Sequence, residues 1–150
     1  MKTKILMVCL GNICRSPLAE GILKSKIDLS KHEVASAGTG HWHVGDSPDP
    51  RSIEVAKKHG LDITDQKGKQ FSTYDFEIYD HIFVMDNSNY HDVIKLAKTE
   101  KEKQKVHRIL NEIFPGENVD VPDPYHGGDD GFEKVYQMLD QACEAIAARL

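Results

Sequence analysis

The chain has 150 residues, a length that suits one domain around one hydrophobic core, so we expect a single domain over residues 1–150. Its 19 Lys and Arg residues against 24 Asp and Glu residues give a net charge of −5, which argues against a general nucleic-acid-binding protein. Three scattered cysteines exclude a disulfide framework and indicate a reducing compartment, and the apolar run after Met1 is too short for a signal peptide or a membrane span, so a cytoplasmic protein is expected.

The first predicted unit is a strand, a loop and a helix. Residues 5–8 form a compact apolar run, which is typical of a strand buried on both faces. A loop containing Gly11 follows, and Pro17 stands where the first turn of a helix tolerates proline. The apolar residues of this helix fall on one face: Leu18, Ala19, Ile22 and Leu23.

The rest of the chain repeats the alternation of strands and helices. The further strand candidates are 33–36, 81–85 and, more weakly, 106–109. The further helices are 50–59, which Gly60 ends, 88–97, and a C-terminal helix with the apolar stripe Phe132, Val135, Tyr136, Leu139, Cys143 and Ile146. This alternation predicts right-handed crossovers and a parallel sheet with helices on both faces. Ligands of such sheets bind beyond the carboxyl ends of the strands, where the loop after the first strand lies.

That loop, residues 9–16, is suited to binding a phosphate and is called the phosphate loop below. A short loop between a buried strand and a helix N-terminus turns its backbone N–H groups inward, and the helix dipole adds to their attraction for an anion. Gly11 and Asn12 tolerate the left-handed backbone that such a loop needs. Arg15 follows the loop, and its planar fork can hold two phosphate oxygens at once.

Cys9 is the candidate nucleophile of this loop. A helix N-terminus and a nearby guanidinium favour the thiolate form of Cys9, and Ser16 can donate a hydrogen bond to it. A bare Cys-x5-Arg pattern leaves open that Cys9 is a buried core thiol and Arg15 a surface cation. The apolar strand before the loop and the helix start after it favour catalysis.

A candidate proton donor lies near the end of the chain. Displacing an alkoxide or phenoxide from phosphorus requires a proton for the leaving oxygen. Asp123 stands between Pro122 and Pro124, which restrict the backbone and orient its side chain. Taken alone, this segment is more simply interpreted as a rigid surface loop.

Together, these segments resemble the low-molecular-weight protein tyrosine phosphatases. The matching stretches are 9–17, 36–39, 42–50, 85–86 and 123–125, and the likeness spans nearly the whole chain. The resemblance implies a three-layer α/β/α fold of flavodoxin- or Rossmann-like type with a four-stranded parallel sheet. It implies phosphotyrosine proteins and small aryl phosphates as substrates, a monomer or weak dimer, and no metal or other cofactor.

The same resemblance implies roles for individual residues. Cys9 attacks phosphorus to form a cysteinyl-phosphate, Arg15 binds the phosphate, and Asp123 protonates the leaving group and then activates water, with an acidic pH optimum. Ser36 and Asp86 support the loop. The implied substrate- and phosphate-binding residues are Leu10, Gly11, Asn12, Ile13, Cys14, Ser16, Trp42 and Tyr125.

Three of these side chains bear on substrate choice. Trp42 and Tyr125 are the expected aromatic walls of a phosphotyrosine slot. The alternative for Trp42 is core packing, but its polar loop favours exposure. Ile13 stands where the related protein-arginine phosphatases carry a smaller Thr, which favours phosphotyrosine over phosphoarginine.

Other positions leave alternatives open. The resemblance implies a reversible disulfide between Cys9 and Cys14, although Cys14 alternatively packs at the base of the loop. Gln66 stands in the place of a family histidine that supports the loop. His41 and His43 are expected on the surface rather than in a metal site. The rival functions are an arsenate reductase, which needs further relay cysteines, and a non-catalytic phosphoprotein-binding module.

Overall fold

The computed structural model describes residues 1–150, apart from the side chain of Asp129. At its centre lies a four-stranded sheet in the order β2-β1-β3-β4, in which all neighbours are parallel. The strands are β1 (Thr3–Cys9), β2 (His32–Gly38), β3 (His81–Val84) and β4 (Val106–Arg108). The predicted α/β class with a four-stranded parallel sheet is confirmed.

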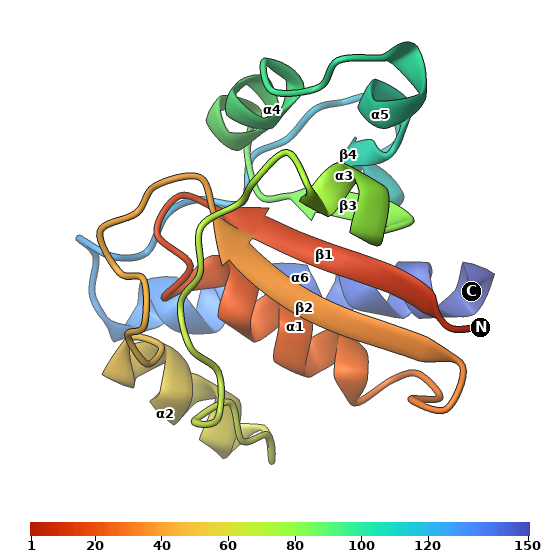
Figure 1. Cartoon of the computed structure of the whole chain (residues 1–150). Helices are drawn as coiled ribbons and strands as arrows, with labels where there is room; N and C mark the ends of the chain where they lie inside the picture. Colours follow the sequence, from red (N-terminus) through yellow and green to blue (C-terminus); the bar gives the residue numbers. More distant parts are fainter.

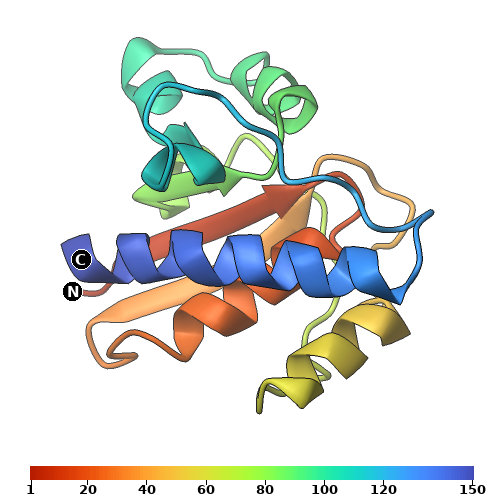
Figure 2. The same ribbon diagram turned by 180° about the vertical axis from the view of Figure 1, so that it is seen from behind.

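Helices cover both faces of the sheet (Figures 1 and 2). They are α1 (Arg15–Lys24), α2 (Pro50–Lys58), α3 (Asp75–Ile78), α4 (Asn87–Ile94), α5 (Glu100–Gln104) and α6 (Asp129–Arg149), with a short 3-10 turn η1 (Ile109–Glu112) after β4. The first, second and sixth helices lie on one side of the sheet and the third, fourth and fifth on the other. Among the described residues, none of the helices combines the length and apolar character that crossing a bilayer requires.

Alternating side chains of β1 point into two separate apolar cores. Ile5 and Met7 pack with α1, α2 and α6, whereas Leu6 and Val8 pack with α3, α4 and their neighbours. All four side chains are fully buried. Because both faces are covered, the strand is apolar throughout, which is why its sequence reads as a continuous run rather than as an alternation.

The strand order places a crevice at the carboxyl end of β1. β2 pairs with one edge of β1 and β3 with the other, so the connections that follow these strands lie on opposite sides of β1. A crevice for a ligand forms where the strand order reverses in this way. β1 ends at Cys9 and α1 begins at Arg15, and the loop between them opens into this crevice. The two termini lie close together at the opposite end of the sheet (Figures 1 and 2).

Candidate active site

A cavity of about 210 Å³ lies where β1 meets α1. Three segments that are far apart in the sequence form its walls: the phosphate loop, the loop after β2 and the loop before α6. The lining residues are Cys9, Leu10, Gly11, Ile13, Cys14, Arg15, Trp42, His43, Asp123, Tyr125 and His126. Most of the residues implied by the sequence therefore meet in one cavity, while Asn12, Ser16, Ser36 and Asp86 lie behind its wall.

Asn12 holds the phosphate loop in shape from behind. Its backbone has a positive φ of 58°, one of the left-handed conformations that asparagine adopts more readily than most residues. Its side-chain Nδ2 donates to Ser16 Oγ at 2.8 Å and to Ser36 Oγ at 2.9 Å, and its Oδ1 accepts from the backbone N–H of Lys69 at 3.0 Å. One buried amide thus ties the loop to α1, to β2 and to the segment before α3.

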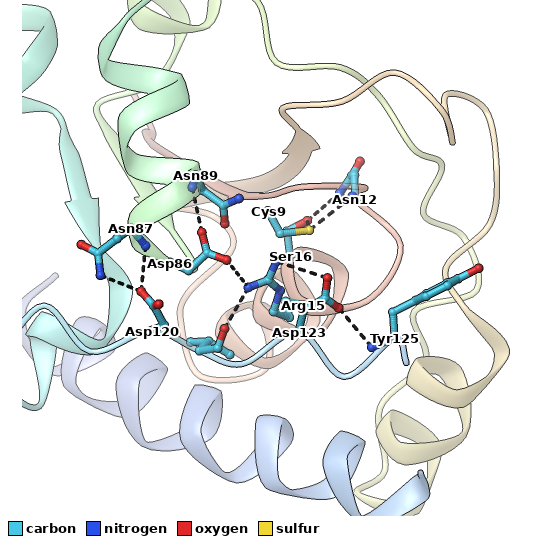
Figure 3. A network of polar contacts seen from close by, with 11 residues as sticks. Cys9, Asn12, Arg15, Ser16, Asp86, Asn87, Asn89, Asp120, Asp123 and Tyr125 are labelled. Carbon is cyan, nitrogen blue, oxygen red and sulfur yellow. Dashed lines mark hydrogen bonds and ion pairs between the residues drawn. The ribbon is translucent and has the colours of Figure 1, made fainter. Parts of the chain in front are cut away.

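Two donors converge on the sulfur of Cys9 (Figure 3). The backbone N–H of Asn12 lies 3.2 Å from Sγ, and Ser16 Oγ lies 3.0 Å from it. Because Ser16 Oγ accepts from the amide of Asn12, its own hydrogen is free to point at the sulfur; its other acceptor, the carbonyl of Ala37, is farther away at 3.5 Å. This arrangement suits a thiolate at the floor of the cavity.

Arg15 is a buried cation beside this sulfur, with a side chain only 3% exposed. One terminal nitrogen of the guanidinium donates to Asp86 Oδ2 at 2.7 Å and to the carbonyl of Val121 at 2.8 Å, and the second terminal nitrogen lies 3.8 Å from Asp123 Oδ2 (Figure 3). Burial by itself lowers the pKa of Arg15, but the negative charges of Cys9 and Asp86 outweigh it and raise that pKa. The guanidinium therefore stays charged and is fixed in direction.

Asp86 links this guanidinium to α4. It is the N-cap of that helix, and its Oδ1 accepts from the backbone N–H of Asn89 at 2.7 Å. Its other oxygen accepts from Arg15. One carboxylate thus serves both the helix end and the cation, which is the arrangement expected of a supporting residue.

The loop of residues 121–128, called the acid loop after its aspartic acid Asp123, brings that residue to the cavity wall. Its first residue is fixed on both sides, since Val121 donates to the carbonyl of Met85 at 2.8 Å and accepts from Arg15. Asp123 is 44% exposed, and its Oδ1 accepts from the backbone N–H of Tyr125 at 3.0 Å. The carboxyl group therefore faces both solvent and the cavity.

The other two cysteines differ from Cys9. Burial, followed by the negative charges of Asp49 and Cys9, raises the pKa of Cys14 to about 12, so Cys14 stays a neutral thiol near pH 7. Burial also raises the pKa of the Cys143 thiol, which lies on α6 and donates to the carbonyl of Ala19 in α1 at 3.7 Å. Cys143 is a fully buried core residue that does not line the cavity, so the cysteine relay that an arsenate reductase requires finds no support here.

The rim of the cavity is aromatic. Trp42 is 63% exposed and Tyr125 is 41% exposed, and both line the cavity rather than the core. The two histidines next to them also line it, His43 and His126. His43 keeps a partly exposed position, in line with the expected surface placement, and it also approaches Gly11 and pairs with Asp46 at 3.1 Å. That His43 lines the cavity could have been predicted from its place directly after Trp42, which was expected at the site.

Gln66 does not join the network around Asn12. Its Nε2 donates to the carbonyl of Pro17 at 3.0 Å, in the first turn of α1. The support that Asn12 receives from this segment comes instead from the backbone of Lys69. A backbone donor does not depend on residue type, so no pattern in the sequence indicates this contact.

Among the side chains that the structure describes, no three His, Cys, Asp or Glu residues gather as a metal site.

Arg51, which no sequence pattern indicated, reaches the acid loop from α2 and donates to the carbonyls of Tyr125 and Gly127.

Comparison with known proteins agrees with this geometry. The family model described as low molecular weight phosphotyrosine protein phosphatase matches residues 4–150. A phosphatase of that name from Schizosaccharomyces pombe is 42% identical over 141 residues, 91% of this chain and 89% of that protein. Another from Sus scrofa is 35% identical over 150 residues, 97% of this chain and 94% of that protein.

Solved structures show the same fold. A protein tyrosine phosphatase from Entamoeba histolytica with Hepes in the active site has a TM-score of 0.92 at 38% identity, covering 99% of this chain and 96% of that one. Wzb of Vibrio vulnificus in complex with benzylphosphonate has a TM-score of 0.89 at 32% identity and covers all of both chains. The chain therefore belongs to the low-molecular-weight protein tyrosine phosphatase family and is a protein tyrosine phosphatase.

Proposed function

We propose that this phosphatase hydrolyses phosphotyrosine and small aryl phosphates through a cysteinyl-phosphate intermediate on Cys9. The observation that carries the proposal is the pair of donors on the Cys9 sulfur, at 3.0 and 3.2 Å, on the floor of a cavity that also contains the Arg15 cation. A thiolate so held is a nucleophile that faces any phosphate drawn into the loop.

In the first step the Cys9 sulfur attacks phosphorus and the bond from phosphorus to the phenolic oxygen breaks. Asp123 gives its proton to that oxygen, so the phenol leaves neutral. Both hydrogens of one Arg15 nitrogen are used by Asp86 and Val121. This leaves the N–H groups of the other two nitrogens to bind the phosphate oxygens as charge builds on them.

In the second step the Asp123 carboxylate accepts a proton from water while the water oxygen attacks phosphorus. The sulfur–phosphorus bond breaks, inorganic phosphate leaves, and the Cys9 thiolate and protonated Asp123 are restored. Asp123 is suited to both directions of proton transfer because it is 44% exposed, so water reaches it.

The preference for aryl phosphates rests on the cavity walls. Trp42 and Tyr125 offer aromatic faces to a phenyl ring, and Ile13, within the phosphate loop, adds an apolar side chain to the cavity lining. The related Wzb structure holds benzylphosphonate, which combines a phenyl ring with a phosphonate. We expect phosphotyrosine to be preferred over phosphoarginine.

Residues 1–150 are proposed to act as one phosphatase domain on phosphotyrosine-containing proteins, as a monomer or weak dimer. The sparse cysteines favour a reducing compartment, and the cytoplasm stays the predicted one.

Hydrolysis of p-nitrophenyl phosphate at mildly acidic pH tests the proposal. We expect turnover by the wild-type protein and none by Cys9→Ser, because a serine hydroxyl is not ionised in this setting. Binding of a phosphotyrosine peptide without any turnover by the wild-type protein would instead indicate a phosphoprotein-binding module.

A further inference from the structure

Arg51, in the first turn of α2, reaches the acid loop with its guanidinium. One nitrogen donates to the carbonyl of Tyr125 at 2.8 Å and another to the carbonyl of Gly127 at 3.2 Å. The N-terminal end of α2 lies beside the loop that leads into α6 (Figures 1 and 2). Two backbone carbonyls of one loop are thus held by one side chain from another element.

Arg51 is itself held by Asp49. The carboxylate of Asp49 accepts from Arg51 Nε and from its terminal nitrogen, both at 3.1 Å, and also caps α2 through the backbone N–H of Arg51 at 2.8 Å. Burial by itself raises the pKa of Asp49, but the hydrogen bonds from Arg51 outweigh it and lower that pKa, so Asp49 stays a carboxylate.

The same residue connects to the phosphate loop. The backbone N–H of Asp49 donates to the carbonyl of Ile13 at 2.8 Å. A chain of contacts therefore runs from the phosphate loop through Asp49 and Arg51 to the acid loop. This chain joins the part of the site that carries the nucleophile to the part that carries the acid.

The flat guanidinium also packs against two aromatic rings. Its central carbon lies 4.5 Å from the ring centre of Phe132, at the start of α6, and 5.5 Å from that of Tyr125. Phe132 is buried, whereas Tyr125 forms part of the cavity rim. A lysine could supply the charge but neither the fork for two carbonyls nor the flat face.

Asp123 depends on the ends of its loop for its position. Its carboxylate accepts from Tyr125, two residues along the chain, and lies 3.8 Å from Arg15. One end of the loop is fixed by Val121 and the other by Arg51. We infer that Arg51 is a positioning residue, which sets Asp123 and the Tyr125 wall relative to Cys9. This inference rests on the proposed acid role of Asp123.

The test uses Arg51→Met and compares kcat/KM for phenyl phosphate with that for p-nitrophenyl phosphate. Phenoxide leaves poorly without a proton, so misplacing Asp123 should lower kcat/KM more for phenyl phosphate than for p-nitrophenyl phosphate. The substrate ratio is defined as kcat/KM for p-nitrophenyl phosphate divided by that for phenyl phosphate, so it should rise. A positioned general acid contributes about 100-fold or more, so we expect partial misplacement to lower kcat/KM about tenfold for phenyl phosphate and less than about threefold for p-nitrophenyl phosphate. Arg51→Lys should not restore the ratio, and it serves for the same measurement where Arg51→Met does not fold.

Two further variants separate positioning from general damage. Lys57→Met, which removes an exposed charge from the same helix, should leave the ratio of the two substrates unchanged. In an Asp123→Asn background, where the ratio is already raised, Arg51→Met should not raise it further. An unchanged ratio in Arg51→Met alone, or an equal rise in both backgrounds, contradicts the inference. If Asp123→Asn itself leaves the ratio unchanged, the proposed acid role fails and the route through Arg51 fails with it.

Discussion

At the scale of single residues, the proposed chemistry depends on how the Cys9 sulfur is surrounded. Its neighbours are a backbone N–H and the hydroxyl of Ser16, which the amide of Asn12 orients. The second thiol of the loop, on Cys14, has its pKa raised to about 12 by burial. Cys9 therefore has two hydrogen-bond donors at its sulfur, whereas Cys14, five residues later, is a buried neutral thiol.

Ser16→Ala tests the contribution of the hydroxyl. The sulfur loses one of its two donors while the loop keeps the contact between Asn12 and Ser36. Without this donor a smaller fraction of Cys9 is thiolate, and since a tenfold change in an ionisation equilibrium corresponds to about 1.4 kcal/mol, the loss of one hydrogen bond should lower kcat/KM for p-nitrophenyl phosphate about tenfold. The rate of alkylation of Cys9 by iodoacetamide should fall as well.

Ser88→Ala, which changes an exposed serine on α4, is the matched control for that variant. Wild-type rates of both turnover and alkylation in Ser16→Ala would show that the hydroxyl does not act on the sulfur.

At the scale of elements, the start of α2 couples a helix cap to the site. Asp49 caps the helix, binds Arg51 and meets the phosphate loop through its backbone. Since the pKa of Asp49 is lowered below its ordinary value of 3.8, its charge stabilises the folded state above that pH. This contribution is lost as the pH falls through the lower folded-state pKa.

Asp49→Ala should lower the free energy of unfolding by about 1 kcal/mol at pH 7, because it removes the N-cap. Asp49→Asn keeps a capping oxygen and should lose less. Thermal unfolding from pH 7 to pH 2.5 measures both. The difference between wild type and Asp49→Asn should shrink as the pH falls below about 4, where the carboxylate of the unfolded chain takes up its proton before that of the folded chain does. A difference that stays constant over this range would contradict the assigned charge.

At the scale of the whole molecule, one face of the sheet depends on α6. This helix runs along β1 and α1, and its buried stripe completes the larger of the two cores. We expect Leu139→Ala, at a fully buried position, to lower the free energy of unfolding by about 2–5 kcal/mol. Gln141→Ala, at an exposed position on the same helix, is the control in urea unfolding. Equal midpoints for the two variants would show that the stripe is not part of the core.

Much of this architecture could be predicted from the sequence. The buried strands at the centre of the sheet show as apolar runs, and the stripe of α6 shows as a helical repeat, because burial dictates residue type there. α3 and α5 were missed, since they have only 4 and 5 residues and too few turns for a periodic pattern. The resemblance to the family indicated the main residues that line the cavity.

Contacts made through the backbone could not be predicted in the same way. Arg15 and Arg51 donate to backbone carbonyls of the acid loop, those of Val121, Tyr125 and Gly127. Every residue type has a backbone carbonyl, so the sequence does not indicate these contacts. In the sequence, Arg51 looks like any charged residue in the first turn of a helix and gives no indication of a partner. Only the folded chain brings it within reach of a loop 74 residues away.

The central claim is that the phosphoryl group is transferred to the sulfur of Cys9 before it reaches water. Trapping this cysteinyl-phosphate intermediate tests the claim most directly. When Asp123→Ala enzyme is mixed with p-nitrophenyl phosphate, the phosphoryl group moves to Cys9 and p-nitrophenolate leaves without needing a proton. The intermediate should then accumulate because the water step lacks its base. Acid quenching followed by peptide mass spectrometry should find one phosphoryl group, on the peptide that contains Cys9, and none in Cys9→Ser. A phosphoryl group on another residue, or steady turnover by Cys9→Ser, would contradict the account.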